Sequence, residues 1–184
     1  MLAPAHLIAF LWLAFAAVWG GSALFTKRAR KRPSWSTWVA RLAIVAVIVA
    51  ANLRFGPGGD ALTAAPRSWQ WVGALLCVIG LGFAVWARIY LGRNWGMPMS
   101  LREGHELVTS GPYALVRHPI YTGILLAMLG SALAVALAWL WALALFFVYF
   151  LYSALTEERM MSEQFPAAYP AYKARTRMLI PFIF

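Results

Sequence analysis

The chain has 184 residues, of which 62% are hydrophobic and only 12% are charged. This balance lies far outside that of ordinary soluble domains and argues against a soluble α/β enzyme of this size. The formal net charge is +10. We attribute this charge to membrane topology signals and to attraction to anionic headgroups. Nucleic acid is excluded as a partner, because the basic cluster is a short loop with no recognisable nucleic-acid-binding fold.

Three charge-free runs predict membrane-spanning helices, and they cover residues 5–25, 69–87 and 120–155. Each of the first two is long enough to cross about 30 Å of hydrocarbon at about 1.5 Å per helical residue. The third would form a helix of roughly 54 Å, so we expect a hairpin with its turn between Gly130 and Ala138. A single long kinked helix is the alternative for this run.

A fourth candidate crossing at 35–53 is interrupted by Arg41 near its start, where the side chain can reach the headgroups. The run at 5–25 is expected to be a retained crossing, because it lacks the charged start and the cleavage site of a signal peptide. The expected fold is therefore all-α, a multi-pass membrane protein with five transmembrane helices. Residues 1–90 hold the first three, and residues 91–184 form the catalytic region with a cytoplasmic cofactor pocket.

Basic residues are distributed unevenly between the predicted loops. The loop between the second and third crossings has only Arg54 and Arg67. The first loop has five basic residues, namely Lys27, Arg28, Arg30, Lys31 and Arg32. The positive-inside rule therefore places the first loop in the cytoplasm and the amino terminus outside. Five crossings then put residues 88–117 and the carboxy-terminal tail in the cytoplasm.

Several kinds of chemistry lose support from the sequence. One cysteine, Cys77, and three histidines cannot build a disulfide framework or a zinc cluster. The stretch IGLGFAVW from Ile79 lacks the third glycine of a dinucleotide-binding loop and lies inside a crossing, so its glycines are interpreted as helix-packing residues. Walker and nucleophile-elbow motifs are missing from the sequence, which argues against phosphoryl transfer and hydrolysis.

Polar residues collect in two segments that flank the predicted hairpin. The first, HELVTSGPYALVRHPIYTG, begins at His105, and the second, TEERMMSEQFPAAYPAYKARTRMLIPFIF, begins at Thr156. The first belongs to a polar connection over 92–119, and connections of that length are usually functional when they are ordered. Because a hairpin returns its ends to one membrane face, we expect both segments to wall a pocket open to the cytosol and to the bilayer.

These segments, with LGRNW from Leu91 before them, resemble the isoprenylcysteine carboxyl methyltransferases and their prokaryotic homologues over 91–184. The shared motifs are HxLVTSGPYxxxRHPxYxG and a Glu-Glu pair followed by FxxxYxxY, an arginine and a proline. The resemblance implies a multi-pass membrane enzyme that binds S-adenosylmethionine at its cytoplasmic face and methylates a lipophilic small molecule or a lipid-modified substrate. It places cofactor contacts on His105, Glu106, Leu107, Val108, Tyr113, His118, Pro119, Ile120, Tyr121 and Glu157.

The chain departs from that family at two positions. Ser153 stands where the eukaryotic enzymes have a substrate-binding arginine, and Pro98 aligns roughly with a glutamine that touches the cofactor. These departures weaken the case for a prenylcysteine carboxylate as the methyl acceptor.

Methyl transfer from a sulfonium depends mainly on holding donor and acceptor in line, and a carboxylate acceptor needs no general base. Glu157 would pair with the ammonium or the ribose hydroxyls of the cofactor, and His118 with its carboxylate. The rings of Tyr113 and Tyr121 offer π faces to the sulfonium or to adenine.

Arg117 and Arg177 are the candidate catalytic residues, because they would supply positive charge near an anionic acceptor. Contact with lipid phosphates is the structural alternative for both. Likewise, Pro119 is also typical of a helix start, and the two tyrosines of the first motif suit an aromatic belt. The Glu157–Glu158 pair favours function, because a carboxylate at the carboxyl end of a helix opposes the macrodipole by about 0.3–1 kcal/mol.

Two other classes of function remain open. Membrane sterol reductases have a related Arg-His-Pro motif and basic tail, and they use NADPH. A noncatalytic lipid-binding or scaffold protein would need the aromatic cluster but not Glu157. Among methyltransferases, a phospholipid amine is the alternative acceptor, and it would need a base such as Glu158 or His118.

Overall fold

A computed structural model describes residues 4–23, 29–31, 35, 39, 66–96, 98–99, 101–102, 104, 106–135, 139–181 and 183. Its elements are, in chain order, α1 (Pro4–Ala23), β1 (Ala29–Lys31), α3 (Arg67–Leu91), the 3-10 turn η1 (Gly92–Asn94), β2 (Leu101–Arg102), the 3-10 turn η2 (Gly111–Ala114), α4 (Pro119–Ala134), α5 (Trp139–Gln164) and α6 (Tyr169–Arg175). Helices dominate, as predicted. Among the described residues the exception is a short ribbon in which β1 pairs antiparallel with β2.

Three of the helices are long and apolar enough to cross a membrane, with candidate spans Pro4–Ser22, Arg67–Asn94 and Trp139–Gln164. Their outward faces expose large apolar side chains such as Leu13, Leu75 and Val148, which suits a lipid environment. Helix α4 is also apolar but shorter. Of the five predicted crossings, the one at 35–53 lies outside the described residues except for Trp35 and Val39, so the count of five stays a prediction.

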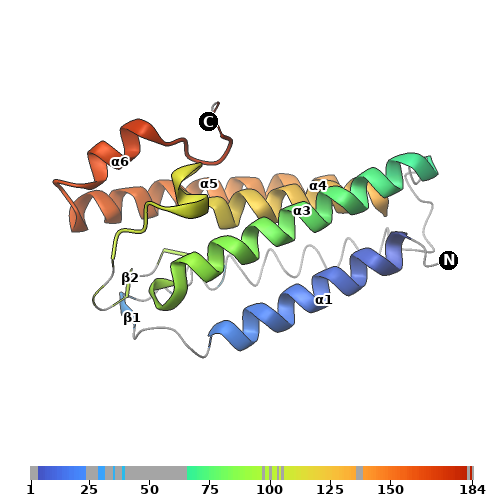
Figure 1. Ribbon diagram of the computed structural model, residues 1–184, viewed down its shortest axis with the longest axis horizontal. Coiled ribbons are helices and arrows are strands. Elements are labelled where there is room, and N and C mark those ends of the chain that lie inside the picture. Colours follow the sequence, from blue (N-terminus) through green and yellow to red (C-terminus); the bar gives the residue numbers. More distant parts are fainter. Residues whose placement is uncertain are drawn as a thin grey trace.

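The run at 120–155 is divided into two helices rather than forming a single kinked one. Helix α4 ends at Ala134 and α5 begins at Trp139, so the break lies within the predicted interval of 130–138. Figure 1 shows α4 running opposite to α1, α3 and α5. The carboxyl ends of those three helices and the amino end of α4 therefore meet at one end of the bundle.

Among the described elements, helices α3 and α4 form the most extensive contact, and glycines allow their backbones to approach closely. A Cβ atom on Gly80 would lie 2.5 Å from the carbonyl oxygen of Gly123, and one on Gly73 would lie 2.5 Å from that of Gly130. The helix-packing interpretation of the glycines in IGLGFAVW is confirmed for Gly80, whereas a Cβ on Gly82 would meet nothing within 4 Å.

Candidate functional site

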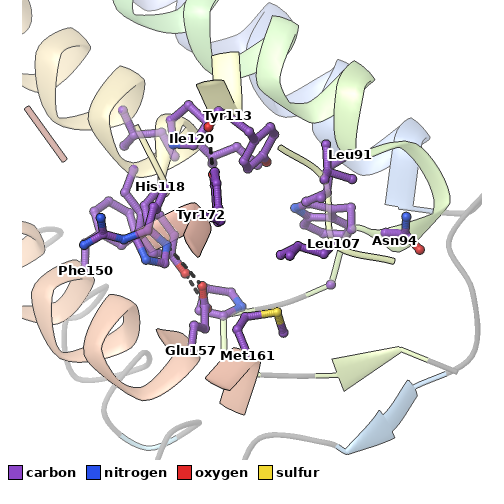
Figure 2. A pocket seen from close by; sticks show the side chains of 18 of the residues that line it. Leu91, Asn94, Leu107, Tyr113, His118, Ile120, Phe150, Glu157, Met161 and Tyr172 are labelled. Atoms are coloured by element: carbon purple, nitrogen blue, oxygen red, sulfur yellow. Dashed lines mark hydrogen bonds and ion pairs between the residues drawn. The ribbon is translucent and has the colours of Figure 1, made fainter. Parts of the chain in front are cut away.

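A cavity of about 270 Å³ lies at the end of the bundle where α4 begins. Side chains from α1, α3, the 92–119 connection, α4, α5 and α6 surround it, and Figure 2 labels ten of the lining residues. His118, Glu157 and Phe150 lie on one side of the cavity, and Leu91 and Leu107 lie on the other. The lining residues are Trp19, Leu91, Asn94, Trp95, Gly96, Pro98, Leu107, Val108, Tyr113, Arg117, His118, Pro119, Ile120, Tyr121, Ile124, Phe150, Glu157, Met161, Tyr169 and Tyr172.

The carboxy-terminal tail holds the Arg-His-Pro segment in place through backbone contacts. The N–H of Arg117 donates to the carbonyl of Arg177 at 2.8 Å, and the N–H of His118 donates to that of Met178 at 3.1 Å. Pro119 follows as the first residue of α4, where its missing N–H costs no helical hydrogen bond. The second polar segment thus positions the first directly.

Three contacts hold the carboxylate of Glu157 in place at the cavity. Its Oε1 accepts a hydrogen bond from the Tyr121 hydroxyl at 2.6 Å and another from the backbone N–H of Met99 at 2.8 Å. Its Oε2 lies 3.5 Å from Nδ1 of His118. Met99 has a φ of 60°, a left-handed conformation that is unusual for a residue other than glycine and occurs most often where function requires it.

Glu158 has a different environment although it is adjacent in sequence. Its side chain is 4% exposed and pairs with Nε of Arg117 and with Nζ of Lys173, both at 2.6 Å. The Arg117 guanidinium also donates to the carbonyls of Thr176 and Lys173. Arg117 lines the cavity, but its charge is already engaged by this buried network.

His118 lies between the two carboxylates. Burial by itself would lower the pKa of the imidazole, but hydrogen bonding and Coulomb attraction to Glu157 and Glu158 outweigh burial and raise the pKa above 6.5. Nε2 of His118 is buried without a hydrogen-bond partner, and it lies 3.8 Å from Oε1 of Glu158. The ring stacks on Tyr121 with centroids 5.4 Å apart, and Tyr121 stacks on Phe150 at 4.4 Å.

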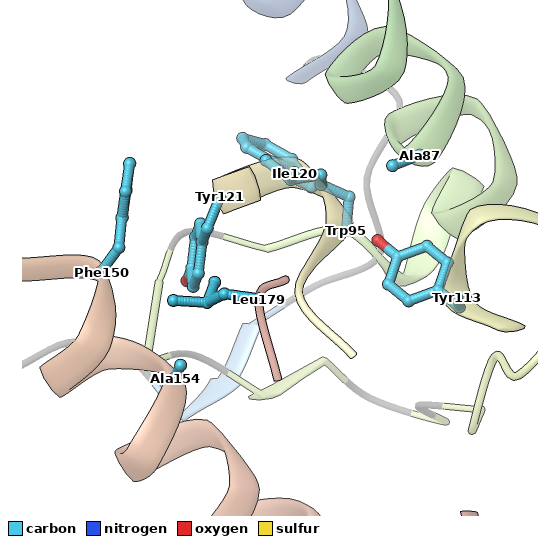
Figure 3. Packing of buried hydrophobic residues seen from close by; sticks show 8 residues of the cluster. All are labelled: Ala87, Trp95, Tyr113, Ile120, Tyr121, Phe150, Ala154 and Leu179. Atoms are coloured by element: carbon cyan, nitrogen blue, oxygen red, sulfur yellow. The ribbon is translucent and has the colours of Figure 1, made fainter. Parts of the chain in front are cut away.

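Aromatic side chains form most of the remaining wall. Figure 3 shows Trp95, Tyr113 and Tyr121 within one cluster of buried hydrophobic residues. The Tyr172 hydroxyl donates to the backbone carbonyl of Tyr113 at 2.7 Å and so ties α6 to η2. Burial, with a further contribution from the negative charge of Glu157, raises the pKa of Tyr113, so its phenol stays protonated at neutral pH.

Most of the residues predicted as cofactor contacts come together around this cavity, namely Leu107, Val108, Tyr113, His118, Pro119, Ile120, Tyr121 and Glu157. Glu106 is exposed and does not belong to the lining, and His105 lies outside the described residues. The two candidate catalytic residues differ in position. Arg117 lines the cavity, whereas the Arg177 side chain is exposed and is not part of the lining. Arg177 reaches the site through its backbone carbonyl.

Several lining residues were not predicted as site residues. Tyr169 and Tyr172 belong to the FxxxYxxY motif, so that motif could have indicated them. Trp19 and Phe150 lie in charge-free runs, where an aromatic side chain that faces a cavity looks the same as one that faces lipid. Within the described part of the chain there is no group of three or more His, Cys, Asp or Glu side chains that could hold a metal ion.

The chain is similar to several known proteins. The cobalt-zinc-cadmium resistance protein CzcN of Cupriavidus metallidurans is 36% identical over 144 residues, which cover 75% of this chain and 61% of that protein. The nickel-cobalt-cadmium resistance protein NccN of Alcaligenes xylosoxydans xylosoxydans is 32% identical over 127 residues, which cover 66% and 58%. The chain thus spans less than two thirds of the length of these two curated relatives.

A shorter match joins the chain to the uncharacterized protein YpbQ of Bacillus subtilis, with 34% identity over 65 residues that cover 35% of this chain. The model of one protein family, described as phospholipid methyltransferase, matches residues 69–168, which is more than half of the chain. This interval contains nearly all of α3, the polar connection, the α4–α5 hairpin and the Glu157–Glu158 pair. The chain therefore belongs to the phospholipid methyltransferase family.

Proposed function

We propose that the protein is an integral membrane methyltransferase that uses S-adenosylmethionine to methylate a lipophilic acceptor. The observation that carries this proposal is the convergence of two polar segments on one cavity, most of whose lining lies in the region matched by the family. The cavity lies where the bundle of apolar helices ends, so a water-soluble donor can meet an acceptor that stays in the bilayer.

The lining residues suit the charge pattern of this cofactor. Glu157 is a carboxylate with further acceptor capacity, since a carboxylate has about four lone-pair sites and its Oε1 accepts two hydrogen bonds. Nε2 of His118 is buried and lies 3.8 Å from Oε1 of Glu158, so this imidazole is engaged with the two glutamates. The aromatic rings of Tyr113 and Trp95 in the lining suit a cationic sulfonium or an adenine ring.

When bound, S-adenosylmethionine supplies an activated methyl group. The residues of this chain would then bind and orient the two reactants, a contribution worth up to about 7–11 kcal/mol in well-oriented systems. Glu157 would hold the ammonium or the ribose hydroxyls of the cofactor. Stacking of His118, Tyr121 and Phe150 fixes the wall against which the ligand lies.

An amine-bearing lipid is the better supported acceptor, and a prenylcysteine-type carboxylate is the alternative. Ser153, at the position of the substrate-binding arginine, is fully buried and donates its hydroxyl to the carbonyl of Tyr149. Among the described residues the cations that line the cavity are Arg117 and His118, and both are already engaged with carboxylates. A carboxylate acceptor would therefore lack a cation of its own.

An amine acceptor must lose a proton before it attacks the methyl group. Glu158 is poorly placed to take it, because this carboxylate is buried against Arg117 and Lys173. His118 is a poor base, because the two carboxylates favour its protonated form. Glu157 is the carboxylate of the described lining that can accept the proton.

Ligand binding in detergent tests the proposed cofactor. We expect the purified protein to bind S-adenosylmethionine and S-adenosylhomocysteine and to leave NADPH unbound, since two phosphates and a 2′-phosphate need cations that are not already paired. Binding of NADPH with no binding of the other two would overturn the proposal in favour of a membrane reductase. No binding of any of the three would favour a noncatalytic lipid-binding protein.

Transfer of a labelled methyl group separates the acceptors. Protein reconstituted in phosphatidylethanolamine vesicles is expected to label the amine lipid. When the same protein is supplied with a farnesylcysteine analogue, we expect the analogue to stay unlabelled. Labelling of the farnesylcysteine analogue alone would show that the methyl acceptor is a prenylcysteine carboxylate instead.

A further inference from the structure

Arg88 is a buried cation outside the cavity lining, in the last turn of α3. Its residue surface is 5% exposed. The guanidinium donates to the carbonyl of Gly92 at 2.8 Å and to that of Ser22 at 2.7 Å. The second bond joins two helices that are separated by a long stretch of sequence.

The two carbonyls explain how the charge is tolerated. Burying an unpaired cation costs several kcal/mol, so such a group needs strong acceptors. Ser22 lies in the last turn of α1, and Gly92 directly follows α3. Both carbonyls therefore belong to helix carboxyl ends, where the macrodipole is negative. The Gly92 carbonyl also accepts a hydrogen bond from the N–H of Trp95 at 3.3 Å. Figure 1 shows these two ends on the same side of the bundle.

Arg88 also contacts an aromatic residue of the cavity wall. Its guanidinium carbon lies 4.5 Å from the centroid of the Trp95 ring, within the range of a cation–π interaction. Trp95 in turn packs edge-to-face against Trp19 of α1, with centroids 5.5 Å apart. Trp95 and Trp19 both line the cavity.

We propose that Arg88 is a positioning residue that fixes Trp95 and the carboxyl end of α1 as one wall of the ligand cavity. This inference rests on the proposed function, because the wall matters for the cofactor only if the cavity binds it. The guanidinium joins α1, η1 and α3 through three interactions at once, which a lysine cannot reproduce because it lacks the planar fork of donors.

Binding of S-adenosylhomocysteine to the full-length protein in detergent tests this role. Arg88→Met, which keeps much of the apolar stem, is expected to weaken binding about tenfold, because a cation–π contact and two charge-assisted hydrogen bonds are lost. Arg88→Lys should recover part of the affinity. The matched control is Arg93→Met, which removes an exposed arginine one turn further on and should bind as the wild type does.

A double-mutant cycle with Trp95→Leu distinguishes positioning from general structural support. If Arg88 acts through Trp95, adding Arg88→Met to Trp95→Leu weakens binding little further. Wild-type affinity in Arg88→Met, or losses that simply add, would overturn the role. Should Arg88→Met fail to elute as a folded, monodisperse protein, the same cycle is carried out with Arg88→Lys. Failure of the wild type to bind S-adenosylhomocysteine would instead overturn the proposed function, and this role with it.

Discussion

Glu157 and Glu158 are consecutive residues with opposite surroundings. Glu157 is partly exposed, faces the cavity and accepts from a phenol and a backbone N–H. Glu158 is buried against Arg117 and Lys173. Successive residues of a helix point about 100° apart, so one side chain can serve a ligand while its neighbour ties α5 to α6 and to the Arg-His-Pro segment.

Replacing each glutamate by glutamine should therefore affect a different property, ligand binding for Glu157 and stability for Glu158. Glu157→Gln is expected to abolish detectable binding of S-adenosylhomocysteine with only a small fall in the thermal midpoint in detergent, because His118 keeps Glu158 as a counter-charge. Glu158→Gln is expected to lower the free energy of unfolding by about 3–5 kcal/mol, because it leaves the buried Arg117 without its counter-charge. Equal losses of stability in both variants would contradict this division.

His118 gives the fold a pH dependence whose direction follows from its neighbours. Its surroundings include Glu157, Glu158, Arg117 and Tyr121, and the carboxylates raise the pKa in the folded state above 6.5. A raised pKa contributes stability that is fully present below the pKa of the unfolded state. That contribution disappears as the pH rises through the pKa of the folded state.

The difference in thermal midpoint between the wild type and His118→Gln measures this contribution. We expect the difference to be largest near about pH 5.5 and to shrink steadily toward about pH 9, as the imidazole loses its proton in the folded state. A difference that stays constant over this range, or that grows with pH, would show that the imidazolium is not stabilised by the two carboxylates.

At the scale of elements, close contact between α3 and α4 sets the position of the site. The amino end of α4 carries His118 at its cap, so a shift of α4 along α3 would move the Arg-His-Pro segment relative to Trp95. Glycines facing glycines determine how closely the two backbones approach.

Gly80→Ala should disrupt this contact, and Gly82→Ala provides the matched control. The new methyl group at Gly80 would lie 2.5 Å from backbone atoms of Ala127 and Gly123, which cannot move independently of α4. We expect a loss of about 1–3 kcal/mol in the free energy of unfolding for Gly80→Ala. For Gly82→Ala, where nothing lies within 4 Å, we expect a neutral or slightly stabilising effect. Equal stability of the two variants would contradict the packing argument.

The sequence was most informative where periodicity or spacing carries a direct physical meaning. Charge-free runs predicted α1 and α3, and the excessive length of a third predicted the division into α4 and α5. The motifs at His118 and Glu157 predicted two segments that meet on one side of the cavity. Trp19 could not be found this way, because its role depends on how α1 packs rather than on local sequence. The same holds for Arg88, whose acceptors are backbone carbonyls that any residue type can provide.

At the scale of the whole molecule, the short β1–β2 ribbon restricts how the chain can cross a membrane. Ala29 pairs with Arg102, and Lys31 pairs with Leu101, so the first basic loop lies beside the connection that carries the site. Any membrane topology must therefore place these two segments on the same side of the membrane. Helices α1 and α3 run in the same direction, so a topology in which both span requires the chain to return across the membrane between Ala23 and Arg67.

The orientation predicted from the sequence has five crossings, with the amino terminus outside and the site and carboxy terminus in the cytoplasm. Single-cysteine labelling in intact cells tests it, since the chain has one cysteine, Cys77, which is buried and can be replaced by alanine. In that background, Arg175→Cys is expected to react with a membrane-impermeant maleimide only after the cells are permeabilised, because Arg175 is exposed on the side of the site. Gly58→Cys, in the predicted outer loop, should react in intact cells. The reverse pattern would invert the orientation and place the cofactor cavity outside the cell, where a methyltransferase that depends on cytosolic S-adenosylmethionine could not work. Labelling of both positions from one side would rule out five crossings.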